Sequence, residues 1–312
     1  MSIYTEAEHA IALTDTVRWI DSPPATPEER YLYGLYQFRL KDYNEAFHWF
    51  SLAACDGVDE AWFDLGECLS KRLTDHSVTL PDLCRLPVPD SEIPEEYCYR
   101  KAWEHYSGNF EDSEHMYRKA YLLSHGFGTV SDPATAAQLF QSVIDMHPDL
   151  TPEHFDICCN YSTEGSAVTA PTKLFKLPVG NAFFELALNR LPALSSSLTQ
   201  ANPSEVSSLR QLLRKAYDFH CEEALFTDFA LFGTNYENYE YQDEIRELYS
   251  FRIGQYVRVC DVNPSEKAYL RLIGMYENGY PGDEGERKKA FAMKAVPLRK
   301  KMEALAETSK PL

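Results

Sequence analysis

The sequence predicts an all-helical fold of antiparallel helix pairs that stack side by side. Apolar residues recur at steps of three and four along residues 43–54, which places them on one face of a helix; they are Tyr43, Ala46, Phe47, Phe50 and Ala54. Asp56-Gly57 then ends this helix, and a second apolar run begins at Ala61. A single helix pair cannot bury its apolar face, so we expect further pairs to stack on it.

The segment from Glu45 to Gly66 resembles the junction between two Sel1-like repeats. In that family an Ala-aromatic helix ends in Ala-Ala, a Gly turn follows, and the next helix opens with Ala and then Leu-Gly. The matching positions are Ala46, Trp49, Ala53, Ala54, Gly57, Ala61, Leu65 and Gly66. The resemblance implies a right-handed α-α superhelix, a Sel1-like and tetratricopeptide-like solenoid, that binds other proteins and needs no cofactor.

Two further segments resemble the same repeats less closely. In residues 121–140 the matches are Gly126, Gly128, Asp132 and Ala136, and in residues 268–296 they are Ala268, Leu272, Tyr276, Gly279, Lys289 and Ala290. Thr129 stands where the family has Val, and Tyr280-Pro281-Gly282 departs from the usual Gly-x-Gly turn. Small residues such as Ala61, Gly66 and Ala290 are expected to let neighbouring helices approach closely, and glycines to form turns with positive φ.

The predicted solenoid carries irregular insertions. Four prolines interrupt residues 72–96, and Tyr99–Tyr106 is interpreted as the displaced second helix of the repeat that starts at Ala61. Residues 148–180 show few helical signals, whereas Pro203 starts a clear amphipathic helix and another is expected over 239–259. We therefore divide the chain into N-terminal repeats (1–147), a divergent helical region (148–260) and a C-terminal repeat with a capping helix (261–312).

Composition narrows the classes of partner. The 312 residues include 30 Lys and Arg against 48 Asp and Glu, a net charge of −18 that disfavours nucleic acids and anionic membranes and favours a basic protein. Charged residues interrupt the apolar positions of residues 1–20, and no apolar run is long enough for a membrane span. A cytoplasmic, bacterial protein is expected. Solubility alone is the alternative explanation of the charge.

No catalytic, cofactor-binding or metal-binding motif is found in the sequence. The eight cysteines form no C-x-x-C pair and are expected to be free and mostly buried. Cys158-Cys159 near His147 and His154 does not have the spacing of a zinc site, and His115 and His125 are given no role.

Two sets of residues are expected to contact a partner. The concave face of a solenoid usually holds the ligand, and its predicted residues are Tyr31, Phe38, Arg39, Phe63, Glu67, Lys71, Arg271 and Met275. The second set is an acidic cluster between tyrosines, Glu237, Glu240, Asp243 and Glu244. A solvated helix face is the alternative interpretation of this cluster.

The sequence as a whole favours a non-catalytic adaptor or an immunity protein that neutralises a basic toxin. A regulatory or assembly scaffold is one rival hypothesis. An enzyme with an unrecognised site in residues 148–260 is another, and a pocket with two or more convergent titratable groups would favour it.

Overall fold

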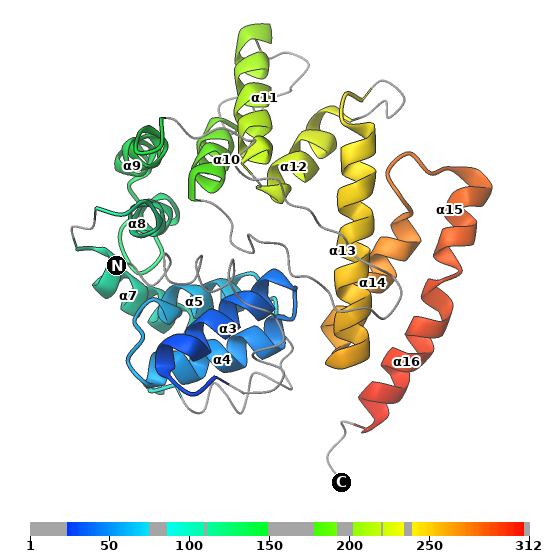
Figure 1. Cartoon of the computed structure of the whole chain (residues 1–312), viewed down its shortest axis with the longest axis horizontal. Helices are drawn as coiled ribbons and strands as arrows, with labels where there is room; N and C mark the ends of the chain where they lie inside the picture. Colours follow the sequence, from blue (N-terminus) through cyan, green and yellow to red (C-terminus); the bar gives the residue numbers. More distant parts are fainter. Residues whose placement is uncertain are drawn as a thin grey trace.

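The computed structural model describes residues 24–74, 86–108, 111–148, 178–191, 202–219, 221–233 and 239–308. In this part of the chain every regular element is a helix, which confirms the predicted all-α class (Figure 1). The helices are α3 (Pro27–Arg39), α4 (Tyr43–Cys55), α5 (Ala61–Ser70), α7 (Pro94–Tyr106), α8 (Ser113–His125), α9 (Pro133–Asp145), α10 (Pro178–Arg190), α11 (Pro203–Asp218), α12 (Glu222–Phe232), α13 (Gln242–Val262), α14 (Glu266–Asn278), α15 (Gly285–Ala292) and α16 (Ala295–Thr308).

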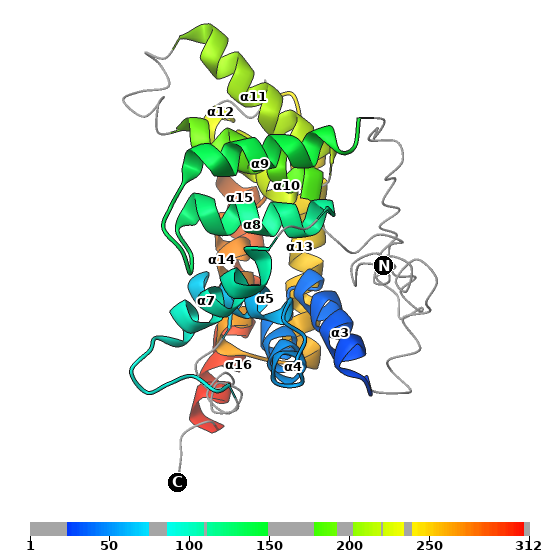
Figure 2. The same ribbon diagram turned by 90° about the vertical axis from the view of Figure 1, so that its left-hand side faces the viewer.

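Successive helices pack in pairs, and the pairs stack in chain order. The pairs are α3 with α4, α5 with α7, α8 with α9, and α10 with α11. Each pair contacts the next one, through α4 and α5, α7 and α8, and α9 and α10 (Figure 2). The pairing of α5 with α7 across the intervening loop confirms that the second helix of this repeat is displaced along the chain.

Local sequence sets where the helices begin. Asp42, Asp112, Asp132 and Ser265 each precede a helix and accept a hydrogen bond from a backbone amide in its first turn. Pro203 occupies the first turn of α11, where the amide that proline lacks has no partner within the helix. The predicted start of this helix is therefore confirmed.

Close approach between helices depends on glycine at Gly66. A Cβ atom on Gly66 would lie 2.7 Å from the Tyr99 ring, so α5 and α7 could not pack this closely with a larger residue. Gly126 and Gly128 have φ of +70° and +66°, as expected for the turn after α8. The expectation for Ala290 is wrong: it is exposed, because α15 packs through Phe291, which contacts Tyr276.

The hydrophobic residues form separate clusters. The largest runs from Tyr31 to Ala224, a small one joins Leu225, Tyr239 and Ile245, and another runs from Ile253 to Ala295. The first cluster continues past residue 148, and the predicted domain boundaries remain predictions. Helix α12, which belongs partly to the first cluster, was not predicted.

The C-terminal helices contact the N-terminal pair. Asn263 Nδ2 donates to the Asp42 carboxylate at 3.1 Å, and Lys267 Nζ donates to the Thr74 carbonyl at 2.9 Å. The Arg271 guanidinium lies over the Tyr43 ring, 5.0 Å from its centroid. Helices α13 and α14 consequently lie beside α3 and α4 (Figure 1), although about 220 residues of chain separate Asp42 from Asn263.

Cysteine burial agrees with the sequence-based expectation wherever the chain is described. Cys68, Cys98, Cys221 and Cys260 are free and buried, whereas Cys55 is free and exposed. The remaining cysteines, Cys84, Cys158 and Cys159, lie outside the described residues. Among the described helices, none combines the length and apolar character that a membrane crossing requires.

Candidate partner-binding groove

A groove of about 750 Å³ lies along α11 and is completed by α12 and the start of α13. One side of α11 is apolar and faces the core, with Leu209 and Leu213 buried. The next turns of the same helix present the residues that line the groove. The lining consists of Pro203, Val206, Ser207, Arg210, Gln211, Leu213, Arg214, Tyr217, Leu225, Asp228, Glu240 and Tyr241.

Two ion pairs cross the groove. Arg210 Nε lies 3.3 Å from the carboxylate of buried Asp228, which also accepts a 2.8 Å hydrogen bond from the Tyr239 hydroxyl. Arg214 Nη1 lies 3.5 Å from the Glu240 carboxylate, and both of these side chains are more than half exposed, at 58% and 57%. The second pair therefore stands at the open rim, where water screens it and where a partner can reach either member.

Two tyrosines that line the groove have raised pKa values, chiefly because they are partly buried. Burial, followed by the carboxylates of Glu244 and Glu247, raises the pKa of Tyr217 to about 12. The pKa of Tyr241 is also raised, by burial, while the Arg214 guanidinium opposes the shift and Glu240 reinforces it. Burial is thus the main cause of both raised pKa values, and Arg214 opposes this effect at Tyr241.

One residue of the predicted acidic cluster lines the groove. Glu240 lines the groove, and Asp243 and Glu244 are exposed in the first turn of α13. Glu237 lies outside the described residues. The sequence did not point to Arg210 and Arg214, although their spacing of four places both on one side of α11 beside its apolar stripe.

The predicted concave-face residues of the N-terminal repeats lie mostly in the core. Tyr31 is fully buried and donates a 2.9 Å hydrogen bond to Asp64, and Phe63 is 6% exposed. Glu67 is also buried and accepts a 2.9 Å hydrogen bond from the Tyr99 hydroxyl. Side chains of packed helices, from the same pair in the case of Glu67 and Tyr99, cover these three residues, which corrects their expected place on an open surface.

The other predicted residues of this set differ in exposure. Lys71 is exposed and forms an ion pair with Glu67, while Phe38 is partly buried against the core. Arg39 ends α3, and its side chain lies outside the described part of the molecule. Arg271 is half-buried over Tyr43, and Met275 packs against the C-terminal cluster. The structure does not gather these residues with the acidic cluster into one surface.

The titratable groups of the groove are engaged with one another. Asp228 and Glu240, the carboxylates that could act as a general base, are each paired with an arginine. Tyr239, whose pKa burial raises, donates its proton to Asp228 in a hydrogen bond. Titratable groups therefore converge in this groove, as the enzyme hypothesis requires, and each carboxylate has an arginine partner.

Comparison with known proteins adds two similar solved structures. One is the crystal structure of a Sel1 repeat protein from Oxalobacter formigenes, with 15% identity and a TM-score of 0.30 over 95% of this chain and 92% of that one. The other is c5321, a protective antigen present in uropathogenic Escherichia coli strains displaying an SLR fold, with 13% identity and a TM-score of 0.24 over 95% and 68%.

No family model and no curated protein matches the chain. Both solved structures have the type of repeat that the motif at Glu45–Gly66 resembles. Because both TM-scores are low, the all-α fold of stacked helix pairs stands on this chain's own helices and contacts.

Proposed function

We propose that this protein is a non-catalytic binding protein that holds a basic segment of a protein partner in the groove along α11. The observation that carries the proposal is a groove with an apolar floor and a negatively charged rim. Val206 and the buried Leu225 are apolar residues of the lining, and Glu240 stands exposed at its rim. Exposed Asp243 and Glu244 follow in the first turn of α13. Interfaces of this kind combine a buried apolar centre with a charged rim that orients the partner.

The exposed ion pair at the rim can be replaced by an ion pair with the partner. Arg214 and Glu240 are exposed, so their attraction contributes about 0–1 kcal/mol and is readily replaced. A lysine or arginine of the partner can take the place of Arg214 beside Glu240, while Tyr241 offers its ring to the displaced cation. The net charge of −18 adds a long-range attraction that speeds the encounter.

The partner can be identified and the groove tested in one affinity experiment. Purified chain is used to capture proteins from its native host, and capture is repeated with the triple variant Glu240→Lys, Asp243→Lys and Glu244→Lys. A matched control carries Glu284→Lys, Glu286→Lys and Glu303→Lys, which change the charge equally at exposed positions of the C-terminal segment. Loss of a basic protein in the groove variant alone is expected.

Equal capture by all three proteins would reject the groove as the binding site. Binding of the recovered partner is also expected to weaken as salt rises from about 50 to 500 mM, because screening shortens the reach of the rim charges. An affinity that does not change with salt would reject the electrostatic part of the proposal. The identity of the recovered protein then distinguishes the more specific hypotheses. Recovery of a toxin would favour an immunity role in the bacterial cytoplasm. Recovery of the subunits of an assembly would favour the scaffold hypothesis instead.

A further inference from the structure

Three potential metal ligands meet where α5, α7 and α8 approach one another. Glu60 immediately precedes α5, His105 lies in the last turn of α7, and His115 lies in the first turn of α8. One ligand atom from each of these residues lies within 4.8 Å of the other two. This cluster lies among the N-terminal helix pairs and shares no residue with the groove lining.

The spacing is close to that of a metal centre. Two ligand atoms that each lie about 2.1 Å from a tetrahedral ion are roughly 3.4 Å apart, so small side-chain rotations bring the three atoms onto one cation. The Glu60 side chain makes no capping hydrogen bond to α5. Two imidazoles and one carboxylate are a donor set that suits zinc and its first-row neighbours, and the fourth position is left for water.

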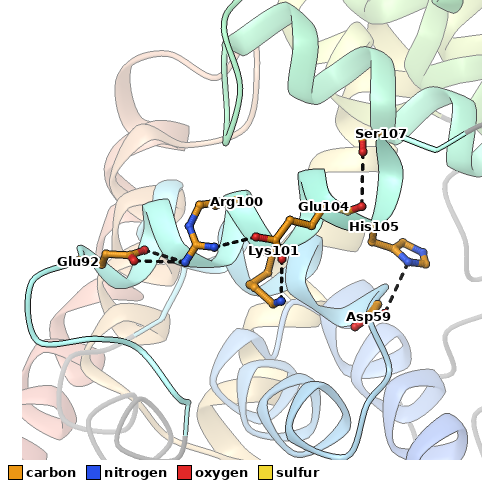
Figure 3. Close-up of polar contacts among 7 residues, drawn as sticks. All are labelled: Asp59, Glu92, Arg100, Lys101, Glu104, His105 and Ser107. Atoms are coloured by element: carbon orange, nitrogen blue, oxygen red, sulfur yellow. Dashed lines mark hydrogen bonds and ion pairs between the residues drawn. The ribbon is translucent and has the colours of Figure 1, made fainter.

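A carboxylate lies on the Nδ1 side of each histidine of the cluster. His115 Nδ1 lies 2.6 Å from the Asp112 carboxylate, an arrangement that fixes the ring and directs Nε2 elsewhere. His105 Nδ1 lies 3.8 Å from the Asp59 carboxylate, and Figure 3 shows the two side chains facing each other. Metal-bound histidines commonly have a hydrogen-bonded carboxylate on the nitrogen that does not bind the metal; the His115–Asp112 distance fits this arrangement, and the His105–Asp59 distance is too long for a hydrogen bond.

Packing and charge also suit a cation. The His105 and His115 rings lie 5.6 Å apart, and the Tyr106 ring contacts both of them. The Arg118 guanidinium, which approaches the Glu60 carbonyl oxygen at 3.4 Å, is held at 2.8 Å from two carboxylates, those of Asp64 and Glu114.

We propose that Glu60, His105 and His115 bind one divalent cation of the zinc class. The bound ion joins the N-terminal ends of α5 and α8 to the C-terminal end of α7. The ligands lie at the ends of three different helices, and 44 residues separate Glu60 from His105, so their spacing forms no zinc motif. The site therefore holds the stacked pairs together and takes no part in the proposed partner binding.

Calorimetric titration of the metal-free full chain with zinc chloride tests the proposal. One zinc ion per chain is expected, with an affinity about tenfold or more weaker in Glu60→Gln and in His105→Gln. Circular dichroism confirms that each variant is folded, and Glu60→Gln keeps the test informative if a histidine variant unfolds. The control is His147→Gln, which changes a histidine at the end of α9 and should bind zinc as the unchanged chain does.

Cobalt substitution separates this site from a cysteine site. The bound Co²⁺ should show visible ligand-field bands without the intense near-ultraviolet absorption of a cobalt–thiolate bond. The proposal is overturned if the unchanged chain binds no zinc, or if both site variants bind as well as it does. It is equally overturned if His147→Gln abolishes binding or if thiolate absorption appears, because zinc would then be held elsewhere.

Discussion

The Arg118–Asp64 pair among the N-terminal repeats and the Arg214–Glu240 pair at the groove join the same chemical groups in different surroundings. Arg118 Nη1 lies 2.8 Å from Asp64, and both side chains are under one tenth exposed, at 5% and 8%. Arg214 and Glu240 lie farther apart and are more than half exposed. Burial turns the first pair into a structural link between α5 and α8, and exposure leaves the second available to a partner.

Tyrosine differs between the two regions in the same way. In the N-terminal pairs, Tyr31 and Tyr99 are buried and donate hydrogen bonds to Asp64 and Glu67 within the core. At the groove, Tyr217 and Tyr241 line an open surface. The N-terminal repeats therefore use their aromatic and acidic residues for stability, and the divergent region presents the same residue types on its surface.

Removing the buried arginine is expected to give the largest effect. Arg118→Ala leaves the Asp64 carboxylate buried without its cation. Burial raises the pKa of Asp64, and the Arg118 guanidinium opposes that shift, so the substitution removes the group that stabilises the charged form. The free energy of unfolding should fall by about 3–5 kcal/mol. Urea denaturation of both proteins measures the difference.

The matched control is Arg214→Ala, which removes an arginine from the exposed pair and should cost about 0–1 kcal/mol. Similar losses for the two substitutions would contradict the distinction between a structural pair and an exchangeable one. A variant Arg118→Ala/Asp64→Leu should recover part of the lost stability, since an apolar residue removes the uncompensated charge.

Glycine at the helix contacts gives a second, smaller contrast. Gly66→Ala places a Cβ atom 2.7 Å from the Tyr99 ring and should lower the free energy of unfolding by about 1–3 kcal/mol. Gly254→Ala in α13 meets no atom within 4 Å and should instead raise it by about 0.5–1 kcal/mol, because alanine favours the helix. Thermal melts of both variants provide the comparison, and destabilisation by Gly254→Ala would show that α13 packs more closely than described.

Much of the fold follows from local sequence. The three- and four-residue spacing from Tyr43 to Ala54 predicts α4, and Pro203 predicts the start of α11, because both signals act within a helical turn. Helix α12 was missed because its eleven residues, EEALFTDFALF, are apolar on most sides and give no clear stripe.

The candidate site was only partly predictable for a different reason. The acidic cluster from Glu240 to Glu244 is visible in the sequence, but its counterpart Arg214 lies on another helix. Periodicity shows which side of a helix is apolar without showing what covers it, so Tyr31 and Phe63 were expected at an open face. The contact between Lys267 and Thr74 depends on the path of the whole chain, and no local pattern encodes it.

The contact between the first and last helices gives the smallest expected effect and depends on pH. Asp42 precedes α4 and accepts a hydrogen bond from Asn263. Burial raises the pKa of Asp42 to about 6. The Glu45 carboxylate adds to this shift, and Asn263 and Arg258 oppose it. The folded chain therefore holds this proton more tightly than the unfolded chain, in which the pKa is about 3.9. Stability from this group is present at low pH and is lost as the pH rises through about 4–6.

Asp42→Asn removes the charge while an amide oxygen remains to cap α4. The variant should match the unchanged chain most closely near pH 4, and by pH 7 it should be more stable by about 1–2 kcal/mol. Urea denaturation at several pH values measures this difference. The comparison is Asp112→Asn, which changes the capping residue of α8. Burial raises the pKa of the Asp112 carboxyl group, but hydrogen bonds from His115 outweigh this effect and lower it, so this substitution should cost stability at pH 7. A stability gain from Asp42→Asn that does not change with pH would mean that removal of the charge is not its cause. The gain would then have to come from a change in packing or hydrogen bonding at this joint, where Asn263 contacts residue 42 and where Lys267–Thr74 and Arg271–Tyr43 also join the helices.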